Sequence, residues 1–304
     1  MTTQVGVESA HAAARAGDQL RRAAALLKAV VSTPGGAFGS IVVLALLICV
    51  VFGDLITPYS SSQQNITERL QGPSMSHLLG TDSLGRDLLS RTMLGARVAL
   101  SVAVPAVLLA LLVGAALGIV AGYVRGWFDQ VAVLIMDTLQ VFPVVLLALL
   151  VLTLLGQSLG NLVVLVAVAF VPNYGRVARA LVLKTKQETY IDAERSLGAG
   201  SWRIVSRHLL PNIVAPFGIL VAMDIPFAIV AEAGLSFLGL GAQPPTPSWG
   251  LILSDGFSTV QTSPWAVIAA SAVLGITTVG FTFLAERIRD VIDPRVGRRE
   301  WRSM

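Results

Sequence analysis

Residues 98–122 read VALSVAVPAVLLALLVGAALGIVAG, an apolar stretch of 25 residues without a charged side chain. A helix needs about 20 mostly apolar residues to cross the roughly 30 Å hydrocarbon core of a bilayer, so this stretch is long enough to span it. A strand of a membrane barrel would alternate polar and apolar residues, and no such alternation is visible here. The stretch therefore predicts a transmembrane helix.

The composition extends this prediction to the whole chain. Of the 304 residues, 54% are hydrophobic and only 13% are charged, and the mean hydropathy is +0.74. Soluble domains carry about 25% charged residues, so this composition predicts a membrane protein. Because its spans are expected to be helices, the predicted fold class is an all-α membrane protein. The apolar blocks predict six spans, at about 38–56, 98–122, 130–155, 161–175, 212–238 and 264–285.

The first and fourth spans differ from the other four. The first follows a leader of 37 residues and contains no A-x-A-like cleavage site, so we expect it to be retained rather than removed as a signal peptide. The fourth is the shortest, because its apolar run stops near Val171 and is followed by Pro172 and Arg176.

The distribution of positive charge predicts the orientation. Basic loops resist translocation and stay in the cytoplasm. Eighteen of the 22 Lys and Arg residues lie in segments that the six spans place on one side, and the other four are Arg69, Arg86, Arg91 and Arg97. Both termini are therefore expected in the cytoplasm. Topology also accounts for the basic pI of about 9.6, so no nucleic-acid partner is expected.

Several kinds of chemistry lack a motif in this sequence. The single cysteine, Cys49, lies within the first span and has no partner for an intrachain disulfide. The three histidines fall in separate segments without an HExxH or Cys/His spacing, so no metal site is predicted. No GxSxG elbow indicates a catalytic serine. A P-loop needs a lysine directly after glycine, and none of the three lysines follows one, so the chain is not expected to bind ATP by that route.

The loop between the fourth and fifth spans is the most informative segment. Residues 188–212 read ETYIDAERSLGAGSWRIVSRHLLPN. This pattern predicts a helix to about Leu197, a stop at Gly198, a second helix from Ser201 and an exit at Pro211. Two short helices at an angle form a protruding elbow. Four of its apolar side chains are predicted to enter a groove on a partner protein, namely Ile191, Leu197, Trp202 and Ile204.

This loop resembles the EAA loop of ABC-importer permeases, E-A-A-x-x-x-G followed by a later Leu-Pro. The resemblance implies that the loop docks on a nucleotide-binding subunit as a coupling helix. Glu194 departs from the pattern, because the family has a second Ala there, and we expect it to pair with Arg195 or with a cation of the partner. The residues assigned to ATPase coupling are Asp192, Ala193, Glu194, Leu197, Gly198, Trp202, Ile204 and Pro211.

Two further stretches narrow the resemblance. Residues 79–91, LGTDSLGRDLLSR, and 232–250, EAGLSFLGLGAQPPTPSWG, are similar to segments of dipeptide and oligopeptide permeases of the DppC/OppC type. The resemblance covers about residues 38–295 and implies the type I ABC-importer permease fold in the bacterial cytoplasmic membrane. It implies alternating-access import of di- or oligopeptides, with nickel complexes or glutathione as alternative cargo. An ion-coupled secondary transporter and an intramembrane enzyme are the rival classes, but no convincing internal repeat or catalytic motif favours either.

The same resemblance implies the partners of the chain. They are a homologous second permease, two ATPase subunits or one fused ATPase chain, an extracytoplasmic peptide-binding protein, and membrane lipid. ATP and Mg would be used by the ATPase partners, and no cofactor by this chain. The expected organisation is a cytoplasmic tail at 1–37, a permease domain at 38–290 and a cytoplasmic tail at 291–304. Within the domain we expect an external loop at 57–97 and the coupling loop at 176–211.

Three acids lie within predicted spans, where an unpaired charge is costly. Asp137, Asp224 and Glu232 are therefore candidates for the substrate path, with structural pairing as the alternative. A second set of candidates is predicted at an outer gate or a contact with the binding protein, where turn and helix-capping chemistry is the alternative. This set consists of Asp82, Arg86, Asp87 and Trp249.

A repeat of small residues marks the second span. Gly114, Gly118 and Gly122 recur every four residues and would let another helix approach closely, either within the chain or from a second subunit.

Overall fold

The computed structural model describes residues 28–292, and every named element in this range is helical. Five helices are long and apolar enough to cross a membrane: α2 (Pro34–Ile56), α3 (Leu88–Val124), α6 (Leu159–Thr185), α9 (Leu210–Phe237) and α11 (Trp265–Ile292). The shorter helices are α4 (Gly126–Val141), α5 (Val144–Leu155), α7 (Thr189–Ser196), α8 (Ser201–Ile204) and α10 (Trp249–Ser258). A 3₁₀ turn spans Ile66–Glu68 and a π-helical turn, η2, spans Val205–Leu209. The all-α prediction is confirmed.

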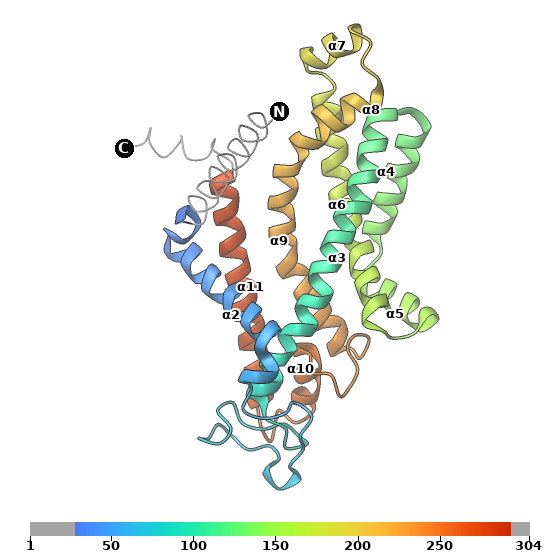
Figure 1. Ribbon diagram of the computed structural model, residues 1–304. Coiled ribbons are helices and arrows are strands. Elements are labelled where there is room, and N and C mark those ends of the chain that lie inside the picture. The colour runs from blue at the N-terminus through green and yellow to red at the C-terminus, as the bar shows by residue number, and fades with distance from the viewer. Residues whose placement is uncertain (1–27, 293–304) are drawn as a thin grey trace, which may run out of the picture.

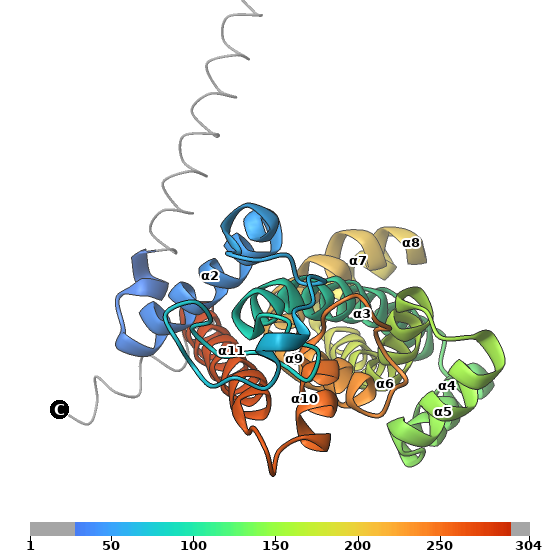
Figure 2. The ribbon, with the colours of Figure 1, turned by 90° about the horizontal axis from the view of Figure 1, so that it is seen from below.

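The helices form a bundle with two differently built ends. Figure 1 shows α7 and α8 beyond one end, and α10 with the loop before α3 at the other. Figure 2 shows α3, α6 and α9 in the middle, with α2 and α11 on one side and α4 and α5 on the other. Parts of both predicted tails, residues 1–27 and 293–304, lie outside the described residues.

The third predicted span, 130–155, is not one straight helix. It is divided into α4 and α5, which meet at an angle of 96°. The cause is local, because Phe142 has ψ of 125° and precedes Pro143, which lacks the N–H that a continuous helix needs. Counted as one broken span, this pair brings the total to six.

Other boundaries also differ from the predictions. The fourth span, predicted at 161–175, lies within α6, which continues through Pro172 to Thr185. The second span starts at Leu88 rather than 98, which shortens the predicted external loop of 57–97. Pro211 does not end the elbow, because it lies in the first turn of α9. Helix α10 was not predicted.

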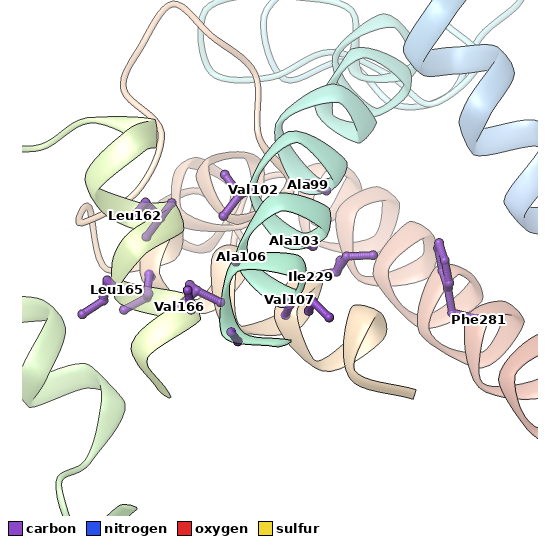
Figure 3. Packing of buried hydrophobic residues seen from close by; sticks show 14 of the residues in the cluster. Ala99, Val102, Ala103, Ala106, Val107, Leu162, Leu165, Val166, Ile229 and Phe281 are labelled. Carbon is purple, nitrogen blue, oxygen red and sulfur yellow. The ribbon is translucent and has the colours of Figure 1, made fainter. Parts of the chain in front are cut away.

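Small residues let α3 pack closely against its neighbours. Figure 3 shows Ala103 and Ala106 of α3 between Val166 of α6 and Ile229 of α9. All four side chains are fully buried.

The glycine repeat of α3 contacts α6 of the same chain. A Cβ atom on Gly118 would lie 2.1 Å from the carbonyl oxygen of Gly175, and one on Gly114 would lie 2.5 Å from that of Val171. Of the two alternatives for this repeat, close packing within the chain is the one observed.

Candidate functional site

Helices α7 and α8 form the elbow that the sequence predicts. Helix α7 ends at Ser196, and Gly198 adopts φ of +79°, a conformation that glycine tolerates better than other residues. The amide of Ala199 donates a hydrogen bond to the carbonyl oxygen of Glu194 at 3.0 Å, which closes the helix end. Helix α8 then starts at Ser201, as predicted.

The elbow has one exposed and one buried apolar surface. Leu197 and Trp202 are 86% and 77% exposed, whereas Ile191 and Ile204 are buried. The prediction that all four enter a partner's groove is therefore wrong for Ile191 and Ile204, which pack inside the chain. A protruding loop that exposes Trp and Leu is typical of a docking surface.

The other coupling candidates are accessible or partly accessible. Asp192, Ala193 and Pro211 are exposed. Asp192 pairs with Arg195 at 3.5 Å, and so Arg195 is not the partner of Glu194. Glu194 instead approaches His208, with Oε1 3.3 Å from Nε2.

Lys186 anchors the base of the elbow. Its ammonium group donates a hydrogen bond to the carbonyl oxygen of Tyr123 at 2.7 Å and lies over the Tyr123 ring. Burial lowers the pKa of Lys186, and the nearby positive charges of Arg195 and Arg125 lower it further.

The opposite end of the molecule holds a buried ion network. Arg86 donates from Nε to Asp82 at 2.6 Å and from Nη2 to Asp255 of α10 at 3.1 Å. Arg91 of α3 places its Nε 3.4 Å from the same Asp82 carboxylate. The network thus connects the loop before α3, α3 itself and α10.

Asp87 and Trp249 add to the same connection. Asp87 is the N-cap of α3, since its carboxylate accepts hydrogen bonds from the amide and the hydroxyl of Ser90 at 2.8 and 2.7 Å. His77 approaches the other oxygen of Asp87 at 2.9 Å. Trp249 donates from its indole nitrogen to the carbonyl oxygen of Thr92 at 2.8 Å.

All four outer candidates, Asp82, Arg86, Asp87 and Trp249, are at most 6% exposed. In this conformation their side chains are buried and join the loop before α3, α3 and α10. Sequence reasoning did not single out His77, Arg91 and Asp255 as members of this cluster. Arg91 at least lies in the quoted motif, but Asp255 is distant in sequence.

The three candidate path acids have different surroundings. Asp137 is exposed and pairs with Arg176 of α6 at 2.6 Å. Asp224 is buried in α9 and accepts a hydrogen bond from the Asn173 side chain of α6 at 3.4 Å. Glu232 is fully buried, and one of its oxygens accepts a hydrogen bond from Ser236 at 2.6 Å. Within residues 28–292, only Asp137 of the three forms an ion pair.

A hollow of about 390 Å³ lies beside α9. Val144 and Val145 of α5, Phe170 of α6 and Ala231 and Gly234 of α9 line most of it, and the lining is almost entirely apolar. Ala231 precedes Glu232 in α9, but the Glu232 side chain is fully buried and does not line this hollow.

Comparison with known proteins supplies the family. Residues 114–298 match the model of the binding-protein-dependent transport system inner membrane component. The chain belongs to this permease family. Residues 32–73 also match the N-terminal TM domain of oligopeptide transport permease C.

Named relatives agree with this family. The chain is 39% identical over 255 residues to a glutathione transport system permease protein, GsiD, of Pectobacterium atrosepticum, covering 84% of this chain and 85% of that protein. It is 38% identical over 258 residues to a dipeptide transport system permease protein, DppC, of Alkalihalophilus pseudofirmus, covering 85% of each. A GsiD of Escherichia coli is 37% identical over 255 residues, covering 84% of each chain.

As a permease of this family, the chain is the multi-pass inner-membrane component of an ABC importer of the peptide or glutathione type, and not its ATPase. Such importers work with a second permease, ATPases and a binding protein. This separates the chain from ion-coupled secondary transporters and from intramembrane enzymes.

The permease's two buried acids give a first testable prediction. We expect Asp224→Asn and Glu232→Gln to leave the stability of the assembled complex unchanged or raised, because a buried carboxylate without a cationic partner is costly. We also expect both to change the uptake rate, because each replaces an ionisable carboxyl group of α9 by an amide. The measurements are thermal unfolding of the detergent-extracted complex and uptake by the same variants.

Asp137→Asn is the control for these variants, since the Asp137 carboxylate is exposed and already paired with Arg176. A loss of several kcal/mol in stability for Asp224→Asn or Glu232→Gln, with unchanged substrate preference, would contradict the path assignment. It would point to an ion pair with another subunit.

Proposed function

We propose that this permease imports short peptides, with glutathione included in that class, by ATP-driven alternating access. The exposed Leu197 and Trp202 of the elbow are the observation that carries the proposal. Because an ATPase partner is needed for ATP-driven transport, the chain must offer that partner a surface outside the membrane, and this elbow is a suitable one.

The fold provides a route from the elbow to the membrane. The elbow is joined to α6 through α7 and to α9 through α8 and η2, so it is placed to act on both helices. Helix α9 carries Asp224 and Glu232 and leads to α10, which belongs to the outer network. ATP shifts the population of two states only if its binding differs between them, and closure of the ATPase subunits on the elbow would provide this difference.

The names of the relatives suggest which substrates to test as cargo. Relatives are named for glutathione and for dipeptides. Both substrates contain a peptide bond with free amino and carboxyl groups. We therefore expect a common peptide-type cargo rather than a metal complex, with finer selection by the binding protein.

The test is uptake by proteoliposomes that contain this chain, its sister permease, its ATPases and its binding protein. Radiolabelled glutathione and Ala-Ala are supplied in separate arms, and a nickel complex in a third. We expect ATP-dependent accumulation of at least one peptide, which is lost when the ATPase subunits are catalytically inactive. Accumulation of the nickel complex alone would overturn the cargo assignment, and uptake without ATP would overturn the mechanism.

The proposed orientation, with both termini in the cytoplasm, gives a second prediction. In a Cys49→Ser background, Thr246→Cys should react with an impermeant maleimide added outside, and Ser201→Cys should react only after the membrane is opened. Both positions are exposed; Ser201 begins α8 and Thr246 lies in the loop before α10, and α8 and α10 lie at opposite ends of the bundle (Figure 1). Labelling of Ser201→Cys alone in intact cells would reverse the orientation.

A further inference from the structure

The backbone between the two elbow helices is poorly suited to transmit force. Residues 197–200 join α7 to α8, and two of the four are glycines. Apart from their chain neighbours, no atoms lie within 4 Å of where Cβ atoms on Gly198 and Gly200 would stand, so neither glycine is held by packing. Glycine is the residue with the greatest backbone freedom. A displacement of α7 must therefore reach α9 through side-chain contacts.

Such contacts exist on one face of α7. Tyr190 and Glu194 are four residues apart and share a face of this helix. Glu194 lies 3.3 Å from His208 through Oε1 and 3.9 Å from Nε of Arg203 through Oε2. The Tyr190 ring lies 5.8 Å from the His208 ring, and the Asn212 side chain donates a hydrogen bond to the Tyr190 hydroxyl at 3.4 Å.

His208 belongs to the irregular turn that joins the elbow to α9. In the π-helical turn η2, the amide of Leu210 donates to the carbonyl oxygen of Val205, five residues back. Pro211 explains this geometry, because it has no N–H to donate and its ring would crowd the carbonyl group of Arg207 in a regular α-helix. Gain or loss of the extra residue of a π-turn rotates the flanking segments by about 100° relative to each other. The contacts of His208 therefore bear on the rotation of α9 relative to the elbow.

We propose that Glu194 and His208 are positioning residues that form a strut from α7 to the π-turn η2, which leads into α9. The strut transmits movement of the elbow to α9 by holding the π-turn in one register. It rests on the proposed function, in which an ATPase moves the elbow. Glu194 stands where the EAA pattern has alanine, whose side chain is too short to reach His208. The strut is thus specific to chains with this substitution.

The test follows movement at the far end of α9 in the complete complex. Leu238→Cys in a Cys49→Ser background places an exposed thiol just after α9. Its rate of reaction with an impermeant maleimide is measured with and without ATP and vanadate, together with ATP hydrolysis. We expect Glu194→Ala and His208→Ala each to reduce the ATP-dependent change in labelling by about tenfold while hydrolysis continues. The double variant should be no worse than either single variant, because both remove the same contact.

Two further variants distinguish loss of the strut from other causes of a reduced response. Arg207→Ala changes an exposed neighbour in the same π-turn and should keep the wild-type response. The exchange Glu194→His with His208→Glu should restore at least half of the response, which loss of a contact to the ATPase would not allow. A wild-type response in Glu194→Ala, or no rescue by the exchange, would overturn the strut. No ATP-dependent change in the wild-type complex would instead contradict the proposed function.

Discussion

Trp202→Asp should abolish ATP-driven uptake while the protein still inserts into the membrane. The Trp202 side chain is 77% exposed on α8 of the elbow. Its replacement should therefore cost the isolated chain little. Buried Trp residues at interface centres typically contribute at least about 2 kcal/mol, and a desolvated aspartate adds a further penalty. The measurements are uptake by the reconstituted complex and co-purification of the ATPase subunits.

Trp127→Asp is the matched control. Trp127 is also strongly exposed and lies at the start of α4, outside the elbow. We expect it to retain uptake and ATPase binding, because no docking surface is assigned to that helix. Normal uptake by Trp202→Asp, or equal loss in both variants, would remove the elbow from the coupling mechanism.

The fold was predictable where a local rule was sufficient. The apolar stretch of 98–122 identified a spanning helix, and Gly198 identified the end of α7, since both signals depend on neighbouring residues alone. The third span was recognised but is not one continuous helix, because Pro143 breaks it. The fourth span was recognised, but its helix is longer than predicted, because it continues through charged residues. Arg179 is paired with Asp129 of α4, with contacts of 2.5 and 2.7 Å, and its charge does not end α6.

The candidate site was likewise predictable where neighbouring residues decide the structure, and not where distant residues do. The elbow with Leu197 and Trp202 was predicted, but the burial of Ile204 depends on tertiary packing, which sequence spacing does not reveal. The outer network was seen only in part. Arg86 and Asp255 are 169 positions apart, so no periodicity relates them. Burial also changes the interpretation of this network, because a motif that suggested a gate is packed inside the protein.

Asp82→Ala should destabilise the protein more than any other single change in the outer network. The Asp82 carboxylate accepts from Arg86 at 2.6 Å and lies 3.4 Å from Arg91, and all three side chains are buried. Removing one partner from a buried ionic cluster leaves uncompensated charge and costs about 3–5 kcal/mol. In this variant Arg86 keeps its contact with Asp255, but Arg91 loses its contact with Asp82. Thermal unfolding of the detergent-extracted complex should show this loss directly.

Asp54→Ala provides the comparison for an exposed pair at the same end of the bundle. Asp54 pairs with Arg97 at 2.6 Å, but its side chain is 70% exposed, so we expect a loss below about 1 kcal/mol. Equal stability of Asp82→Ala and wild type, together with weaker docking of the binding protein, would favour the outer-gate prediction for Asp82. A large loss for Asp82→Ala with a small one for Asp54→Ala would instead assign the network to holding α10 against α3. Because α9 leads into α10, a movement of α9 would then have to shift the ion pairs that hold α10 against α3. This end of the bundle would resist opening until the elbow moves.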